Sequence, residues 1–258
     1  MLFSTRYTLG FSAVVCVACS LLVSSVAVGL RQRQDANALL EKRRNVLMAA
    51  GLLKPGESAD RARVQELFQQ IVPKVFDMKT GEYVEDINAE TYDPIAAQQD
   101  PAMSKVAPEN QSKIKRIPNY GLVYQVMEDG KLKMLVFPIQ GMGLWSTLYG
   151  FVAIDKDANT ILGITYYQHG ETPGLGGEVD NPKWKASWIG RKVFDQNWNV
   201  AIRVIKGPAA SPQEAPHEVD GLSGATLTSQ GVTAMLQFWL GENGYGPYLR
   251  KFKESGRV

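Results

Sequence analysis

A short segment of acidic, glycine and hydroxyl residues has the composition of a phosphate-binding turn. It runs Asp220-Gly221-Leu222-Ser223-Gly224-Ala225-Thr226 and directly precedes an amphipathic stretch, 229–240, that predicts a helix. Helix N-termini attract anions because their backbone N–H groups and the helix dipole favour negative charge there. Glycines let the backbone approach a ligand closely. The segment therefore predicts a phosphate site, and the Thr226 hydroxyl could also hold the phosphate covalently.

Two further blocks are rich in glycine. Residues 170–178 have the sequence GETPGLGGE, and residues 141–146 have the sequence GMGLWS. The first block lacks the Gly-Lys-Ser/Thr of a P-loop and the spacing of a dinucleotide-binding turn. Small residues let backbone lie against a flat ring, and backbone N–H groups stabilise negative charge on it. Block 170–178 therefore predicts a ring contact through Thr172 and Leu175, with an ordinary irregular loop as the alternative.

The order of these blocks behind an apolar N-terminal segment resembles the C subunit of the sodium-translocating NADH:quinone oxidoreductase, as far as Pro247. The pattern D-x-x-[S/T]-G-A-T is similar to the signal by which flavin mononucleotide (FMN) is attached through a phosphoester to the last threonine, here Thr226. The G subunit of the Rnf electron-transport complex shares this motif and is one alternative. A membrane-anchored scaffold without a redox role is another.

The resemblance implies a membrane-anchored flavoprotein subunit that relays electrons through covalent FMN. The whole complex, and not this chain alone, would oxidise NADH, reduce ubiquinone and export sodium. The resemblance further implies other subunits as partners, a flavin transferase that uses FAD and a divalent metal, and a main domain on the periplasmic side of the bacterial inner membrane. The sequence predicts no acid–base or nucleophilic catalytic set, no metal site and, at a net charge of +2, no nucleic-acid partner.

The residues expected to bind FMN come from four parts of the chain. Thr226 carries the phosphoester, while Ser223 and Thr228 can donate to phosphate oxygens. A cation at Lys206, after a predicted strand, can pair with the phosphate, although a solvated strand-end lysine is an open alternative. The expected FMN contacts together are Asp220, Gly221, Leu222, Ser223, Gly224, Ala225, Thr226, Thr228, Trp145, Glu171, Thr172, Gly174, Leu175, Gly176 and Lys206.

Purely structural roles compete with several of these assignments. Thr226 or Thr228 could instead cap the following helix, which is a common role of threonine. Asp220 could make an Asx turn before Gly221. Trp145 could equally be a core residue.

An apolar run near the N-terminus predicts a membrane anchor. Residues 7–30 are 24 residues without a charge, enough at about 1.5 Å per residue to cross a hydrocarbon core of about 30 Å. A cleaved signal peptide ending near Ala27 is the alternative, but such apolar cores have only about 7–15 residues. Cys16 and Cys19 lie in this run and are interpreted as small apolar residues of the span. Arg6 precedes the run and five basic residues at 31, 33 and 42–44 follow it. This charge pattern opposes the implied periplasmic domain, although long domains translocate largely regardless of flanking charge.

The sequence predicts an anchor over residues 1–33, with its transmembrane helix at about 7–30, and a single soluble covalent-FMN-binding domain over 34–258. Segments 121–127 and 131–138 flank Glu128-Asp129-Gly130, a hairpin signal, and 148–154 and 160–167 flank a second turn. Helices are expected over 35–50, after a cap at Ser58, and over 181–189, with a further strand over 199–206. Because the strands follow one another along the chain instead of alternating with helices, and the helices lie at the periphery, the sequence predicts an α+β fold with an antiparallel sheet.

Overall fold

The protein is described by a computed structural model that covers residues 4–54, 57 and 59–255. The chain divides into two compact units, one ending at Arg43 and the other beginning at Arg44. Ser58, the expected cap of the second helix, lies outside the described residues. That helix, α2 (Arg61–Phe68), is capped by Asp60, whose carboxylate accepts the Arg63 N–H at 2.8 Å.

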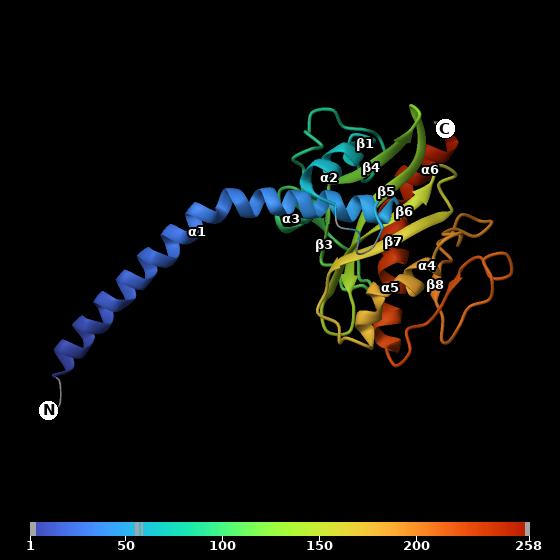
Figure 1. The fold of residues 1–258 in the computed structure, drawn as a ribbon. Helices are drawn as coiled ribbons and strands as arrows, with labels where there is room; N and C mark the ends of the chain where they lie inside the picture. Colours follow the sequence, from blue (N-terminus) through green and yellow to red (C-terminus); the bar gives the residue numbers. More distant parts are fainter. Residues whose placement is uncertain (1–3, 55–56, 58, 256–258) are drawn as a thin grey trace. The chain divides into compact units, whose positions relative to one another are not determined.

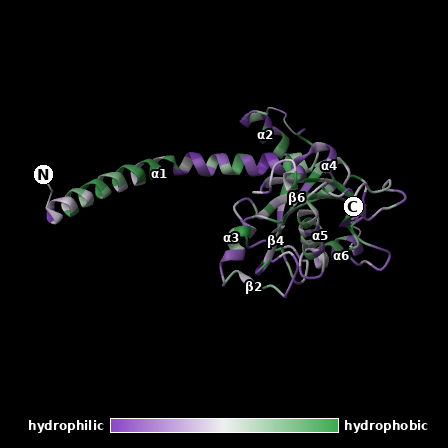
Figure 2. Cartoon of the chain, turned by 90° about the horizontal axis from the view of Figure 1, so that it is seen from below, coloured by the Kyte–Doolittle hydropathy of each residue, from purple (hydrophilic) through white to green (hydrophobic). Residues whose placement is uncertain are grey.

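Helix α1 (Thr5–Ala49) is continuous, where the sequence predicts two helices. Residues 31–44 are rich in Arg, Gln, Ala, Leu and Glu, which favour helix, so α1 does not stop where the apolar run ends. Thr5–Arg31 is the one described segment long and apolar enough to cross a membrane, and its side chains are exposed. Figure 2 shows the change along α1 from largely apolar green to polar purple.

The centre of the second unit is a five-stranded antiparallel sheet in the order β1-β4-β5-β6-β7. Both predicted hairpins, β4–β5 and β6–β7, are confirmed. Asp129 and Gly130, in the β4–β5 turn, have φ of 52° and 75°, the two positive values that a type I′ turn requires. The strands are β1 (Ile71–Asp77), β4 (Tyr120–Glu128), β5 (Lys131–Met142), β6 (Thr147–Asp155) and β7 (Ile161–Gln168).

Both faces of this sheet are covered. On one face Phe137 and Val152 are buried in the core cluster that contains Met235 of helix α5 (Thr226–Leu240) and Phe252 of helix α6 (Gly246–Glu254). On the other face Phe68 of α2 packs edge-on against Tyr124 of β4. Figure 1 shows α5 and α6, at the red end of the colour scale, beside the sheet. Covering both faces explains why the strands carry long apolar runs rather than a strict alternation.

The remaining elements are short. Segment 88–119 contains α3 (Pro94–Gln99), β2 (Ser104–Val106) and β3 (Arg116–Pro118). A 3-10 helix, η1 (Gly176–Asp180), precedes α4 (Pro182–Ala186). The strand expected over 199–206 is reduced to β8 (Arg203–Val204), which pairs in parallel with β9 (Glu218–Val219), a strand that the sequence did not predict. Helix α5 begins three residues earlier than expected, at Thr226.

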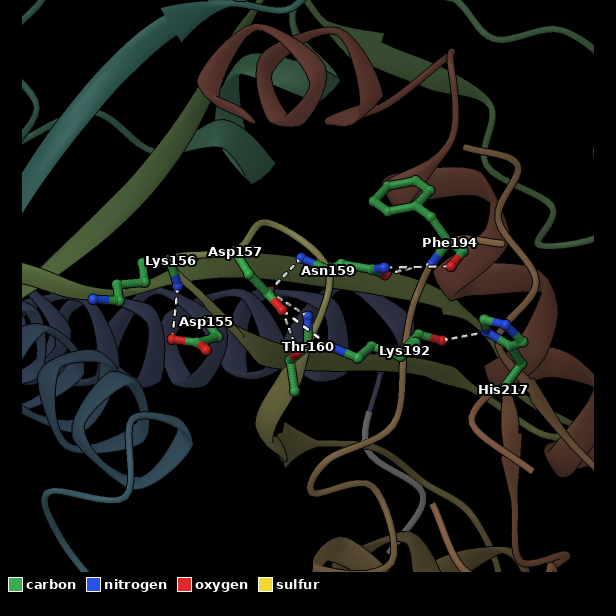
Figure 3. A network of polar contacts seen from close by, with 8 residues as sticks. All are labelled: Asp155, Lys156, Asp157, Asn159, Thr160, Lys192, Phe194 and His217. Carbon is green, nitrogen blue, oxygen red and sulfur yellow. Dashed lines mark hydrogen bonds and ion pairs between the residues drawn. The ribbon is translucent and has the colours of Figure 1, made fainter. Parts of the chain in front are cut away.

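A polar network ties the β6–β7 turn to the segment that leads into β8 (Figure 3). The Asp157 carboxylate accepts the N–H groups of Asn159 and Thr160 and the ammonium group of Lys192 at 2.7–3.0 Å. The Asn159 side-chain oxygen accepts the Phe194 N–H at 2.7 Å. These bonds fix the start of the chain that runs on to Lys206 and to residues 220–226, the predicted phosphate site, which is named the phosphate-binding segment after that prediction.

Candidate functional site

Helix α5 begins at Thr226, which is exposed, and its N-cap residue is Ala225. Ala225 has no side-chain oxygen, and the first intrahelical bond runs from the Ser229 N–H to the Ala225 carbonyl at 3.0 Å. The interpretations of Thr226 and Thr228 as caps are therefore wrong. The first-turn N–H groups of a helix have no partner within the helix. The start of α5 thus offers backbone donors to an anion beside the Thr226 hydroxyl.

A hollow of about 660 Å³ opens beside the start of α5. Its volume is within the range of small-molecule sites. Two separate chain segments and the first turn of α5 line it, which brings Lys206 and Thr226 into one cavity. The lining residues are Val204, Ile205, Lys206, Gly207, Pro208, Asp220, Gly221, Leu222, Ser223, Gly224, Thr226, Ser229 and Gln230.

Hydrogen bonds hold the phosphate-binding segment at its first residue and at Leu222. At its beginning, the Asp220 carbonyl accepts the indole N–H of Trp184 at 2.8 Å. The Asp220 carboxylate accepts the Ala209 N–H at 2.8 Å, eleven positions away, so the Asx-turn interpretation is wrong. Further along, the Leu222 N–H donates to the Ser229 hydroxyl at 3.2 Å. The segment is thus anchored by α4, the 207–209 turn and α5 together.

Two glycines of this segment are required by close contacts. A Cβ on Gly221 would lie 2.2 Å from the Ile205 carbonyl oxygen. Gly224 has a φ of 68°, and a Cβ there would lie 2.9 Å from a methyl group of Leu175. The second contact shows that block 170–178 lies against the phosphate-binding segment.

The Glu171 carboxylate connects block 170–178 with the 141–146 block and with the first turn of α5. It is 5 % exposed and accepts the backbone N–H groups of Leu144, Trp145 and Ser146 at 2.9–3.2 Å. It also accepts the Thr228 hydroxyl at 2.6 Å, and Thr228 is 0 % exposed. Burial would raise the pKa of Glu171, but the bonds from Thr228 and the three N–H groups outweigh it and hold that pKa below its ordinary value.

Glycines make room for this carboxylate. A Cβ on Gly176 would lie 2.6 Å from the Thr228 hydroxyl oxygen and 2.7 Å from a Glu171 carboxylate oxygen. A Cβ on Gly143 would lie 2.7 Å from the other oxygen. The absence of a side chain at Gly176 therefore serves the Glu171–Thr228 contact, whereas its expected contact with FMN stays a prediction.

None of the other expected ring contacts is among the residues that line the hollow. Trp145 is 69 % exposed, so the interpretation as a core residue is wrong. Thr172, Gly174 and Leu175 are exposed as well. Exposed apolar side chains at positions 145 and 175 suit a flat aromatic ligand, and direct contact with it remains a prediction.

Three residues that hold the site were not among the expected ones. The Ser146 hydroxyl accepts the Gly170 N–H at 2.6 Å, which joins two glycine-rich blocks. Trp184 and Ser229 anchor the phosphate-binding segment. Hydroxyl groups inside glycine-rich blocks are a signal that could have indicated Ser146, whereas nothing local marks Trp184.

Comparison with known proteins places this site in a family. Residues 143–241 match the FMN-binding domain family. The C subunits of the Na(+)-translocating NADH-quinone reductases of Vibrio vulnificus (strain YJ016) and Pseudomonas aeruginosa PAO1 are each 47% identical, over 98% of this chain and 97% of theirs. The crystal structure of Shewanella oneidensis NqrC is similar at a TM-score of 0.77 and 35% identity, covering 85% of this chain and 99% of that one. The crystal structure of the same reductase's C subunit from Parabacteroides distasonis has a TM-score of 0.67 at 27% identity, covering 85% and 96%. The predicted α+β fold, with an apolar helix before an FMN-binding domain, is thereby confirmed.

Proposed function

The chain belongs to the family of Na(+)-translocating NADH-quinone reductase C subunits, and on that premise we propose that Thr226 carries FMN through a phosphoester. The protein is an electron-relaying flavoprotein subunit of this oxidoreductase complex, so other subunits are its partners. NADH oxidation, ubiquinone reduction and sodium export belong to the complex as a whole. The observation that carries the proposal is the position of Thr226, exposed at the first residue of α5 in a hollow that Lys206 also lines.

The donors around Thr226 fit a phosphate group. The first-turn N–H groups of α5 and the Ser223 hydroxyl can hold its oxygens, and the Lys206 ammonium group can balance its charge. Gly221 and Gly224 line the hollow, and their lack of a side chain lets the backbone there pack closely against Ile205 and Leu175. The flavin ring would be held by Trp145, Thr172, Gly174 and Leu175. When bound, FMN accepts and releases electrons.

Burial separates the two threonines as acceptors. Thr226 is exposed, whereas Thr228 is 0 % exposed and donates its hydroxyl hydrogen to Glu171. A flavin transferase that uses FAD and a divalent metal would reach only Thr226. The Thr226 oxygen would bond to the phosphorus of the FMN half, AMP would leave, and the hydroxyl proton would pass to a base. This difference supports Thr226 over Thr228.

The apolar N-terminal helix supports a single-pass anchor in the bacterial inner membrane. We place the anchor in residues 1–33 and the FMN-binding domain in 34–258, on the periplasmic side. Electron relay by this domain would then take place at the membrane surface beside the other subunits.

Peptide mass spectrometry tests the attachment. Full-length protein produced together with the transferase should yield one tryptic peptide with the added FMN mass, on Thr226. Thr226→Val is nearly isosteric and should abolish the added mass and the electron transfer, while Thr226→Ser, which keeps the hydroxyl group, should retain at least part of both. The added mass on Thr228, or its persistence in Thr226→Val, would refute the assignment.

A further inference from the structure

We propose that Glu171 is a positioning residue of the FMN site, which rests on the proposed attachment at Thr226 and deepens it. In this role the carboxylate joins the 144–146 turn, block 170–178 and the first turn of α5 into one unit, and so fixes where Thr226 presents its hydroxyl group. Its four hydrogen bonds reach the 144–146 turn and the first turn of α5, which are far from Glu171 and from each other along the chain.

The carboxylate acts through protein groups rather than through the ligand. Two carboxylate oxygens offer about four acceptor sites. Three backbone N–H groups and the Thr228 hydroxyl already occupy that capacity. Glu171 is also 5 % exposed and is absent from the lining of the hollow. A direct contact with FMN, as the sequence suggested, would require one of these bonds to break.

The bond to Thr228 controls the place of Thr226 because both residues belong to the first turn of α5. Thr228 points to Glu171 while Thr226, two positions earlier, is exposed at the hollow. Because helix geometry couples the two positions, movement of Thr228 would turn the Thr226 hydroxyl away from the phosphate donors.

Glycines on the neighbouring elements leave space for the Glu171 carboxylate. Gly143 and Gly176 stand against its two oxygens, where a Cβ would come within 2.7 Å. Gly231 of α5 lies against the 141–146 block, where a Cβ would meet the Met142 carbonyl oxygen at 2.3 Å. Glycines on all three elements let them close on the carboxylate, which indicates a built connection rather than a chance contact.

The test compares the initial rate of FMN attachment in full-length variants, measured by intact-protein mass spectrometry with the transferase, FAD and Mg²⁺ well below the unfolding temperature. Thr228→Val removes the hydroxyl donor at nearly constant shape, and Thr228→Ser keeps it. Glu171→Gln removes the charge and one acceptor oxygen. Glu178→Gln is the matched control, since Glu178 lies in the neighbouring η1 and its carboxylate accepts only the Asn181 side-chain amide, at 2.7 Å, among the bonds described.

We expect the attachment rate to fall about tenfold in Thr228→Val and in Glu171→Gln, the effect of one lost hydrogen bond to a charged group. Thr228→Ser and Glu178→Gln should stay near the wild-type rate. Thermal unfolding of each variant shows whether it is folded at the assay temperature, and rescue by serine separates positioning from general destabilisation. Wild-type rates in both Thr228→Val and Glu171→Gln, with FMN on Thr226, would overturn the positioning role alone. FMN on another residue of the wild type would overturn the proposed function itself.

Discussion

The indole N–H of Trp184 donates to the Asp220 carbonyl at 2.8 Å, which ties α4 to the first residue of the phosphate-binding segment. Trp188, one turn later, packs edge-on against Trp184 with ring centroids 5.4 Å apart. Its indole N–H is buried, and no described residue accepts it. The two tryptophans share a core, but only one of them holds the site.

This difference makes a matched pair of variants. Trp184→Phe loses packing and the hydrogen bond to the Asp220 carbonyl. Trp188→Phe loses packing but no hydrogen bond to a described residue. We expect Trp184→Phe to lower the rate of FMN attachment at Thr226 and Trp188→Phe to leave it unchanged. The lost bond itself should contribute about 0.5–1.5 kcal/mol to the unfolding free energy. Urea unfolding and intact-protein mass spectrometry measure the two quantities, and equal attachment rates in both variants would contradict the prediction.

Lys206 supplies the positive charge at the hollow that contains Thr226. Lys206→Gln keeps most of the side-chain length and removes the charge, so it should slow FMN attachment by about two- to fivefold, the range of an exposed ion pair. The loss should shrink as salt rises, because salt screens exposed charges. Lys183→Gln, on the exposed surface of α4, is the control. A salt-independent defect, or an equal one in Lys183→Gln, would argue against a phosphate partner.

Local signals predicted the hairpins but not their neighbours in the sheet. The Asp129-Gly130 pair accounts for the β4–β5 turn because both residues adopt positive φ. The pairing of β1 with β4 brings Ile71 opposite Val126, and no nearby residue type specifies such a distant partner. Strands β8 and β9 are two residues each, too short to show a period of two.

Local sequence signals likewise predicted the segments of the site but not the contacts between them. Composition marked the segment before α5 and block 170–178, and the structure brings them into contact through Gly224 and Leu175. The start of α5 was predicted too late, because threonine favours caps over helix interiors and Ala225 gives no capping signal. The Glu171–Thr228 bond joins residues 57 positions apart, which no spacing rule could indicate.

The orientation of the domain has a direct test. The family resemblance favours the periplasm, while the basic residues after the apolar segment favour the cytoplasm. An alkaline-phosphatase reporter fused after Val258 should therefore be active, and a reporter that works only in the cytoplasm should be inactive at the same position. An inactive alkaline-phosphatase fusion together with an active cytoplasmic reporter would place the domain in the cytoplasm and contradict this prediction.

Gly176→Ala adds a Cβ where the Thr228 and Glu171 oxygens already lie 2.6 and 2.7 Å away. One of them must move, so the bond between them should lengthen. We expect a loss of about 1–3 kcal/mol in unfolding free energy, typical of overpacking, together with slower FMN attachment. Gly170→Ala in the same block adds a Cβ at an ordinary 3.4 Å from Ser146 and should change neither quantity appreciably. If Gly176→Ala were as stable as Gly170→Ala, the added Cβ would be accommodated without disturbing the Glu171–Thr228 bond, which would contradict the prediction.

The stability of the domain in acid should report on Glu171. Its folded-state pKa is lowered, since the hydrogen bonds from Thr228 and the 144–146 backbone outweigh the effect of burial. The unfolded chain therefore binds the proton more readily, and the stabilisation is fully present above the unfolded pKa of about 4.3 and lost as pH falls through the lower folded pKa.

Asp157 behaves alike, because bonds from Thr160, Asn159 and Lys192 outweigh its burial and lower its pKa. Urea unfolding between pH 7 and pH 3 should show a shallower acid slope in Glu171→Gln and in Asp157→Asn. The double variant should be flatter still, because the two carboxylates share no partner among the bonds described. An acid slope in Glu171→Gln as steep as that of the wild type would show that the Glu171 carboxylate is not held in its charged form by these donors.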